Sequence, residues 1–382
     1  MTTRFAPTTP RRPAITILGA GHIGFAMALL LHEAGDYELT VADRDAARLA
    51  PVAAMGLATL HIPGDAELAG ALQGRFAVLN ALPFHCAVKA ATLCVQARVH
   101  YFDLTEDVQS TQAIRALAAT ARTVLMPQCG LAPGFIGIVG HDLARRFDAL
   151  HTLRMRVGAL PRYPQGALRY NLTWSTEGLI NEYCNPCEAI VDGVRTTVPP
   201  LEGLETFALD GVEYEVFNTS GGLGTLTETL AGRARQVDYQ SIRYPGHCAI
   251  LKLLLNDLRL RDRRDLLRDI LEAAIPTTDQ DVIVVFATAS GLREGRLVQD
   301  SYSARILGTR VAGHTLSAIQ LTTAAGICTA LDLVAEGRLP QQGFVGQEAV
   351  ALADFLANRF GTVYAGQRPE RTGLPAAREV AA

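Results

Sequence analysis

Three glycines near the N-terminus have the spacing of a phosphate-binding turn. They form a GxGxxG motif that follows the apolar run 15–18 and precedes a helical pattern. In such a turn the first glycine permits a tight bend, the second lets the backbone approach a pyrophosphate, and the third lets the helix pack closely on the strand. The free N–H groups at the helix N-terminus then hold the pyrophosphate. The motif predicts dinucleotide binding by Gly19, Gly21, His22, Ile23 and Gly24.

An acidic residue follows at the distance that a dinucleotide fold requires. Asp43 ends the second apolar run, 37–43, about 20 residues after the glycine turn. A carboxylate there accepts hydrogen bonds from the adenine ribose and repels a 2′-phosphate, so NAD is favoured. Arg44 follows directly and could accept that phosphate, which keeps NADP as the alternative. A glycine-rich turn without a nucleotide and a methyltransferase turn are two other interpretations.

The same segment also resembles an export signal. Arg4, Arg11 and Arg12 precede an uncharged stretch that runs from residue 15 to residue 31, which is typical of a basic region followed by an apolar one. A histidine and three glycines interrupt that stretch, and no small-residue cleavage site follows it. We therefore favour a strand, a phosphate-binding turn and a helix.

Apolar runs and helical patterns continue to alternate after Asp43. Strands are expected within 75–83, 98–104 and 122–128, with helices at 87–97 and 110–121. This order predicts an α/β domain with a Rossmann-type, doubly wound parallel sheet. Ligands bind beyond the carboxyl ends of such strands. We therefore expect cofactor contacts in the loop after the first of these three strands, at Asn80, Ala81 and Pro83.

Length and composition limit the class of protein. The chain has 382 residues, which suggests two domains at roughly 100–200 residues each. Its net charge of −3 provides no basic field for nucleic acid. Seven cysteines are too few, and odd in number, for a disulfide framework, which favours a reducing compartment. We expect a cytoplasmic protein with a small-molecule substrate and without a nucleic-acid or membrane partner.

The middle of the chain has longer alternating runs. Strands are expected at 153–160, 167–175, 207–217, 234–244, 281–291 and 295–307, with helices at 177–184, 226–232, 247–258 and 265–275. Such runs predict an α+β second domain with a mostly antiparallel sheet. A helical tail at 315–337 is expected to pack back onto the first domain. The predicted domains are residues 1–132, completed by 313–382, for the dinucleotide, and 133–312 for substrate and dimerisation.

Several segments together resemble the saccharopine dehydrogenase family over about residues 14–365. They are the glycine turn, Asn80–Phe84, Tyr101–Asp103, Pro127–Gly134, Tyr170–Ser175, Phe217–Gly222 and Ile242–His247. Cys129–Gly134 and Phe217–Gly222 are the most specific, and the chain is most similar to the lysine 6-dehydrogenase and saccharopine reductase branches. The resemblance implies NAD(P)-dependent oxidation of a C–N bond in an amino acid, or the reverse joining of an amine to an aldehyde. It also implies a Rossmann domain completed by the C-terminus, and a homodimer.

That chemistry needs groups that move protons. The amine must be uncharged before its carbon loses a hydride, and the imine that forms must then be hydrolysed. Asp103 at a strand end and His247 in a family-like segment are the acid–base candidates, and Cys129 is expected to line the nicotinamide pocket. Each has a simpler alternative: a turn-capping carboxylate, a structural histidine and a buried thiol.

An amino-acid substrate also needs a partner for its carboxylate. Arg243 can bind a carboxylate through two N–H groups, and Glu177 and Asn171 could hold a distal amine. A surface charge on a strand and backbone hydrogen bonding are the structural alternatives for these residues. The loop expected to supply hydroxyl and backbone donors comprises Asn218, Thr219, Ser220, Gly221 and Gly222.

A CxxC pair and two other functions complete the alternatives. Cys184 and Cys187 have no second CxxC or paired histidines at zinc-finger spacing, so no metal is expected. A carboxylated polyamine dehydrogenase of the carboxynorspermidine type is the second enzyme hypothesis. A catalytically silent dinucleotide-binding sensor on the same fold is the hypothesis from another class.

Overall fold

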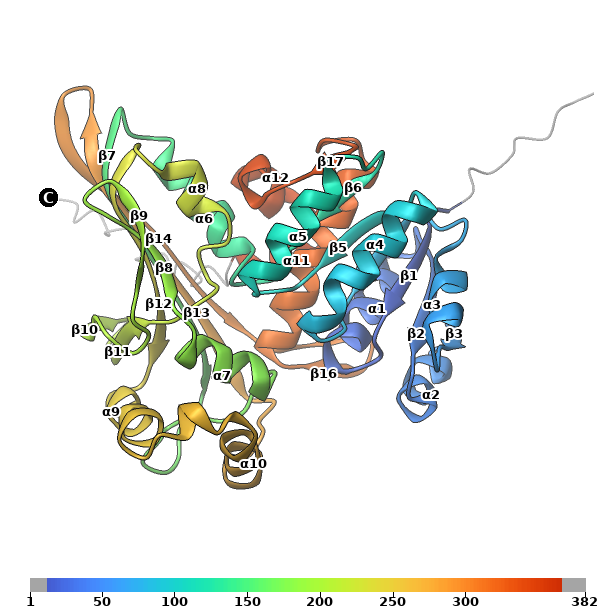
Figure 1. Cartoon of the computed structure of the whole chain (residues 1–382), viewed down its shortest axis with the longest axis horizontal. Coiled ribbons are helices and arrows are strands. Elements are labelled where there is room, and N and C mark those ends of the chain that lie inside the picture. Colours follow the sequence, from blue (N-terminus) through green and yellow to red (C-terminus); the bar gives the residue numbers. More distant parts are fainter. Residues whose placement is uncertain (1–11, 366–382) are drawn as a thin grey trace, which may run out of the picture.

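A parallel seven-stranded sheet forms the first domain of the structure, a computed structural model that describes residues 12–365. The strand order is β17-β6-β5-β4-β1-β2-β3 (Figure 1). This confirms the predicted Rossmann-type sheet, whereas residues 1–11 and 366–382 of the predicted first domain lie outside the described residues. The strands are β1 (Ala14–Leu18), β2 (Glu38–Asp43), β3 (Ala58–His61), β4 (Ala77–Asn80), β5 (His100–Asp103), β6 (Val124–Met126) and β17 (Gly343–Phe344).

Helices cover both faces of this sheet because its strands are apolar on both sides. Ile15, Ile17 and Val41 pack with α1 and α11, whereas Leu18 and Val78 pack with α3, α4 and α5. Adjacent strand residues thus point into two different cores. The helices are α1 (His22–Ala34), α2 (Ala46–Ala54), α3 (Asp65–Leu72), α4 (Ala87–Ala97), α5 (Val108–Ala118) and α11 (Ala318–Ala335).

The second domain is built on an eight-stranded sheet. Its order is β10-β11-β12-β7-β13-β14, with β8 and β9 attached to β12. Only β7 and β12 pair in parallel among these strands, which confirms a mostly antiparallel sheet. The strands are β7 (Ala149–Pro161), β8 (Cys187–Val191), β9 (Val194–Val198), β10 (Glu205–Leu209), β11 (Val212–Asn218), β12 (Ala234–Arg243), β13 (Asp281–Arg293) and β14 (Arg296–Leu307).

Two of the predicted strands are wrong. Segment 167–175 has no ladder, only one isolated bridge from Leu172 to Thr277, because its alternating apolar residues instead fill a core with the nearby helices. Segment 207–217 is two strands rather than one. Asp210 and Gly211 both have positive φ, at 52° and 75°, and this Asp-Gly pair turns β10 back onto β11.

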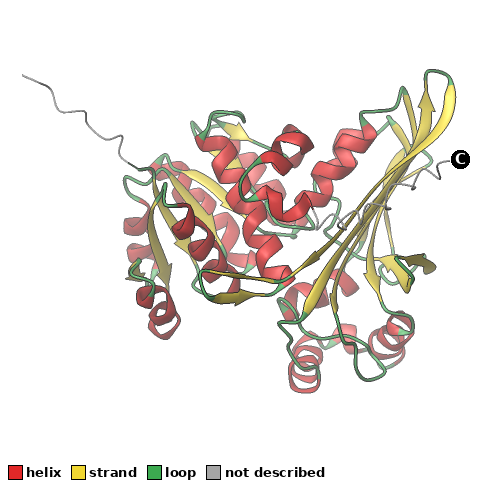
Figure 2. Ribbon diagram, turned by 180° about the vertical axis from the view of Figure 1, so that it is seen from behind, coloured by secondary structure: helices red, strands yellow, loops and turns green. Residues whose placement is uncertain are grey.

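The helices of the second domain form two groups (Figure 2). Helix α6 packs on β7 and β13, and α8 lies beside it. Helices α7, α9 and α10 share a separate core with Tyr170 and Phe217. Their bounds are α6 (Phe135–Ala144), α7 (Thr176–Cys184), α8 (Leu226–Leu230), α9 (His247–Lys252), which continues into a π-helical turn at Leu253–Asp257, and α10 (Arg264–Ala274).

The C-terminal segment packs on the first domain. Strand β17 extends the parallel sheet beside β6, and α11 packs against α1 and β13. Of the helices in the described residues, α11 alone is long and apolar enough to cross a membrane, and 83% of it is buried inside the protein. The segment ends with α12 (Leu352–Ala357) and a short 3-10 helix.

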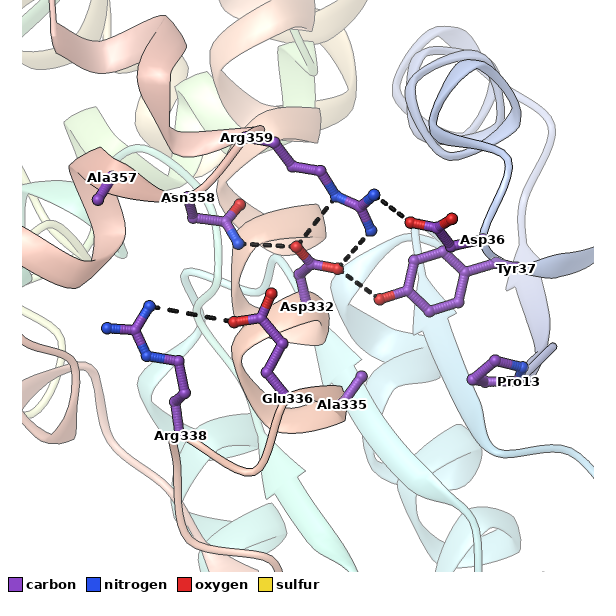
Figure 3. Close-up of a pocket in the computed structure, with 10 residues that line it drawn as sticks. All are labelled: Pro13, Asp36, Tyr37, Asp332, Ala335, Glu336, Arg338, Ala357, Asn358 and Arg359. Carbon is purple, nitrogen blue, oxygen red and sulfur yellow. Dashed lines mark hydrogen bonds and ion pairs between the residues drawn. The ribbon is translucent and has the colours of Figure 1, made fainter. Parts of the chain in front are cut away.

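An ionic cluster fastens this segment (Figure 3). Asp332 of α11 accepts hydrogen bonds from Tyr37 Oη at 2.6 Å, Asn358 Nδ2 at 2.7 Å and Arg359 Nη2 at 2.7 Å. Arg359 also pairs with Asp36, which precedes β2. Burial alone would raise the pKa of Asp332, but these hydrogen bonds hold that pKa below its ordinary value. We call Asp36, Tyr37, Asp332, Asn358 and Arg359 the C-terminal latch.

Candidate functional site between the two domains

The glycine turn has the geometry of a pyrophosphate site. A Cβ added to Gly24 would lie 1.8 Å from the carbonyl oxygen of Gly19, so only glycine permits this helix–strand contact. A Cβ on Gly21 would have no atom within 4 Å, which leaves the turn open on that side. Helix α1 starts at exposed His22 and has no side-chain cap. Its first N–H groups therefore fit the phosphates of NAD(P).

Asp43 lies where the sequence predicts it, but its carboxylate is engaged. Oδ2 accepts the backbone N–H of Ala20 at 2.6 Å and Oδ1 accepts that of Asp45 at 2.8 Å. The residue is 4% exposed, so it first of all holds the glycine turn. Its contact with the ribose stays a prediction. Arg44 is exposed beside it, and its carbonyl oxygen lies 2.9 Å from His61 Nε2.

The loop after β4 lies against the glycine turn. A Cβ on Gly19 would be 3.0 Å from the carbonyl oxygen of Ala81. Asn80 donates to Tyr101 Oη at 3.0 Å and accepts the N–H of Leu82 at 3.1 Å, which fixes the start of this loop. Pro83 follows as an exposed residue. The contacts of Asn80, Ala81 and Pro83 with the cofactor stay a prediction.

Asp103 ends β5 as a buried and hydrogen-bonded carboxylate. It accepts Tyr101 Oη–H at 2.8 Å and the N–H groups of Thr105 and Gln128 at 3.0 Å each. Burial raises the pKa of Asp103 to about 6, although these hydrogen bonds act in the opposite direction. A carboxyl group with that pKa exchanges protons near neutral pH, so the acid–base role of Asp103 remains our prediction.

Cys129 is an unreactive thiol. Its Sγ lies 3.1 Å from the carbonyl oxygen of Met126, and the side chain is 2% exposed. Burial, with Asp103 nearby, raises its pKa well above the ordinary value, which disfavours the thiolate that a nucleophile requires. Its backbone N–H donates to the carbonyl oxygen of Asp103 at 2.8 Å. The predicted lining of the nicotinamide pocket is still compatible with this position.

Glu106 is a functional candidate that we did not single out from the sequence. It belongs to the loop after β5, yet it reaches the second domain. A Cβ on Gly178 would lie 3.2 Å from Glu106 Oε1, and one on Gly221 would lie 3.1 Å from Glu106 Cβ. The pKa of Glu106 is raised to about 7, mainly by burial and in smaller part by the charges of Asp107, Asp103 and Glu177. Its position two residues before α5, in the loop after β5, is the signal that the sequence offers.

Arg243 and His247 form one buried network with Tyr183. Arg243 Nε donates to Tyr183 Oη at 2.8 Å, and Nη1 donates to the carbonyl oxygen of Ile242 at 2.9 Å. His247 Nε2 lies 3.0 Å from Tyr183 Oη, and Nδ1 lies 3.0 Å from the carbonyl oxygen of Leu168. Burial, and next the charge of Arg243, lower the pKa of His247 to about 3. With both ring nitrogens occupied, the predicted acid–base role of His247 has no support from its surroundings.

Glu182 connects this network to Glu106. Its Oε2 lies 3.4 Å from Arg243 Nη2, and its backbone carbonyl accepts the N–H of Ser220 at 3.0 Å. Burial raises the pKa of Glu182 to about 7, with Arg243 lowering it and Glu106 raising it. The predicted carboxylate ligand Arg243 thus already has an acidic partner, and two of its five N–H groups remain free.

The other predicted substrate residues divide into two groups. Ser220, Gly221 and exposed Glu177 lie around Glu106 and α7, where Ser220 Oγ donates to the carbonyl oxygen of Asn181 at 3.0 Å. The rest make structural contacts. These are Asn171 Nδ2 to Pro276 O at 3.1 Å, Asn218 Nδ2 to Pro199 O at 3.4 Å, Thr219 Oγ1 to Ser241 Oγ at 2.8 Å, and Gly222, which lies too close to the Tyr239 ring for a Cβ.

A cavity of about 400 Å³ lies elsewhere, beside the C-terminal latch (Figure 3). Tyr37 in its wall precedes β2, whereas Asp43 ends that strand. The cavity is therefore at the opposite edge of the sheet from the strand-end loops, where ligands of this fold bind. The charges of the latch already pair with one another, and we assign the cavity no catalytic role.

The protein has the features of a two-domain NAD(P)-dependent dehydrogenase. A glycine turn lies on a parallel sheet, and the second domain reaches the acidic residues at the ends of the sheet's strands. The chain belongs to the saccharopine dehydrogenase family. Residues 15–126 match the model of the saccharopine dehydrogenase NADP binding domain, and residues 130–360 match that of the saccharopine dehydrogenase C-terminal domain. The protein is accordingly an oxidoreductase that acts on a C–N bond of an amino acid with NAD(P).

Two solved structures are similar to this chain. Saccharopine dehydrogenase (L-Glu forming) from Saccharomyces cerevisiae is similar with a TM-score of 0.71 and 16% identity, over 88% of this chain and 94% of that chain. A probable dehydrogenase from Thermotoga maritima gives a TM-score of 0.44 and 12% identity, over 91% of this chain and 94% of that chain. At these identities the likeness to the yeast enzyme concerns the fold alone.

Proposed function

We propose that the protein oxidises the carbon that carries a side-chain amine in a lysine-like or saccharopine-like amino acid. The observation that carries this proposal is the contact of Glu106 with Gly178 and Gly221. It brings the carboxyl ends of the Rossmann strands against α7 and the loop of Ser220. A substrate held there would face both the cofactor turn and the acidic groups.

The chain's own residues would orient the substrate and move protons. Bound NAD(P)⁺ would supply the hydride acceptor. Asp103, with a pKa raised by burial to about 6, would accept the proton of the amine and return it when the hydrated imine collapses. Arg243 would bind the α-carboxylate through its remaining N–H groups. Cys129 would form part of the wall of the nicotinamide pocket.

A panel of amines tests this function. The wild-type protein is incubated with NAD⁺ or NADP⁺ and with lysine, ornithine, saccharopine or a simple monoamine, and reduced cofactor is measured by absorbance. We expect reduction with at least one of the amino acids and none with the monoamine. The Asp103→Asn variant should lose about 100-fold in kcat and still bind the cofactor. Cofactor binding without turnover of any amine would overturn the proposal and favour a sensor.

Assembly and location belong to the same proposal. We propose a cytoplasmic homodimer with a role in lysine metabolism, on the basis of the family and of the seven cysteines. Light scattering of the purified protein tests the dimer, and fractionation of the producing cells tests the location.

A further inference from the structure

Glu106 and Glu182 lie on the same side of α7. The Glu106 carboxylate contacts the position of Gly178, and Glu182 is four residues further along the same helix. Residues four apart on a helix are neighbours, with about 5–6 Å between their Cβ atoms. The two carboxylates therefore stand about one helical turn apart, on the side of α7 where the two domains meet.

The charges around Glu106 do not balance. Four carboxylates surround it: Asp103, Asp107, Glu177 and Glu182. The charges of the first three raise the pKa of Glu106, and the charge of Glu106 in turn raises the pKa of Glu182. Arg243 is the cation among these facing groups, and it pairs with Glu182. Within residues 12–365 Glu106 makes no ion pair, and no group of three or more side chains is suited to a metal ion. The site therefore favours an added organic cation.

Near these acids, two buried hydroxyl groups have no hydrogen-bond partner among the described residues, and the charge of Glu182 acts on one of them, Tyr170. Tyr170 is 4% exposed, and its Oη makes no hydrogen bond; neither does Thr173 Oγ1. The Tyr170 ring lies under Arg243, at 5.1 Å from the guanidinium carbon to the ring centroid. Trp174, which follows Thr173 in sequence, packs on Gly178 beside Glu106. An unpaired buried hydroxyl costs free energy unless a ligand supplies its partner.

We propose that Glu106, Glu182 and the Tyr170 hydroxyl bind the α-ammonium group of the substrate, which is not the amine that reacts. This inference rests on the proposed function and specifies its substrate class: an amino acid with a second amine on its side chain. The α-carboxylate would lie at Arg243, next to Glu182, so that adjacent residues of opposite charge bind the zwitterion. A protonated amine between the two carboxylates would also keep both of them ionised.

Equilibrium binding of unreactive analogues tests the subsite. L-norleucine keeps the α-ammonium group, hexanoate lacks it, and neither has a side-chain amine to oxidise. Calorimetry with NAD(P)H present should show that the wild type prefers norleucine. In Glu106→Gln that preference should fall by about 10–100-fold, the loss of a charge-assisted hydrogen bond, while hexanoate affinity stays level or rises. The control is Glu213→Gln, an exposed acid on β11, which should match the wild type.

Turnover gives an independent readout. Glu106→Gln should lower kcat/KM for lysine by the same factor but leave kcat/KM for 6-aminohexanoate, which lacks the α-amine, within about 2-fold. Tyr170→Phe should weaken norleucine binding by several-fold and keep the fold. An equal loss for both ligands, no loss, or no preference for norleucine in the wild type would overturn the subsite. If no amine is turned over but norleucine is preferred, the proposed function fails and the subsite stands.

Discussion

Arg243 Nη2 lies 3.4 Å from Glu182 Oε2 inside the second domain, where Arg243 is 3% exposed. Tyr170 and Tyr183 both lie against the guanidinium, whose carbon is 5.1 and 5.6 Å from their ring centroids. A charge in such a place is stable only with its partners. The position of Arg243 therefore depends on Glu182, and that of Glu182 depends on Arg243.

Arg243→Ala should lower the free energy of unfolding by about 3–5 kcal/mol, because it leaves Glu182 buried without a cation and Tyr183 without a donor. The KM for a carboxylated substrate should rise in the same variant. Arg243→Lys keeps the charge but loses the planar set of donors. Its free energy of unfolding should therefore be intermediate between those of the wild type and of Arg243→Ala. Urea unfolding and initial rates measure these effects. A stable Arg243→Ala protein with an unchanged KM would remove Arg243 from the site.

The stability of the ligand-free protein should decrease as pH rises from 5 to 8. The pKa of Glu106 is about 7 in the folded protein and near its ordinary 4.5 in the unfolded chain. The folded state therefore binds the proton more tightly, and this stabilisation is lost as pH rises through 7. Glu106→Gln should reduce the change between pH 5 and pH 8 by about 1–2 kcal/mol. Urea unfolding at the two pH values measures this free energy. If it changed by the same amount between pH 5 and pH 8 in the wild type and in Glu106→Gln, the raised pKa of Glu106 would be contradicted.

About the fold, the sequence was informative wherever local patterns decide the structure. Five strands of the parallel sheet, β1, β2, β4, β5 and β6, follow from apolar periodicity and turn residues, as do α7, α10 and the β13–β14 pair. Strand β3 could not be expected, because it has only four residues, all of them exposed, and includes no β-branched apolar residue. Segment 167–175 alternates like a strand, but it packs against α7, which follows it directly, and against α9 and α10, more than 70 residues further along the chain.

About the site, residue type indicated the region but not the roles. Asp43, Asn80 and Asp103 lie at strand ends as expected, because parallel topology alone places them there. His247 and Thr219 looked functional from motif context, yet their hydrogen bonds are structural. Glu106 gains its importance from Gly178 and Gly221, more than 70 residues away in sequence, and no local pattern encodes such a contact.

Cofactor preference should respond to two neighbouring residues. Arg44→Ala should weaken NADPH binding by several-fold and leave NADH binding level, because Arg44 is the exposed cation at the end of β2. Asp43→Ala should weaken NADH more than NADPH, and it should also destabilise the protein because two backbone N–H groups lose their acceptor. Fluorescence titration of each reduced cofactor measures both. Arg162→Ala, an exposed change in the second domain, is the control, and an unchanged NADH to NADPH ratio in both variants would contradict these roles.

The C-terminal latch should affect stability without affecting the substrate. Asp332→Ala should lower the free energy of unfolding by about 3 kcal/mol, since it leaves Arg359, Tyr37 and Asn358 without their common acceptor. The substrate KM should stay within about 2-fold, because the latch lies at the opposite edge of the sheet. Thermal unfolding and initial rates measure the two quantities. A large change in KM at unchanged stability would place the cavity of Figure 3 in the active site.

A crystal structure with NAD(P)H and L-norleucine bound tests the central claim most directly. The account predicts pyrophosphate density at Gly21, with the ligand between the nicotinamide and α7. Its ammonium group should be within hydrogen-bond distance of Glu106 or Glu182, and its carboxylate should contact Arg243. Two results would contradict this account. One is ligand density in the cavity beside Asp332, and the other is a ligand between the two domains whose ammonium group points away from Glu106 and Glu182.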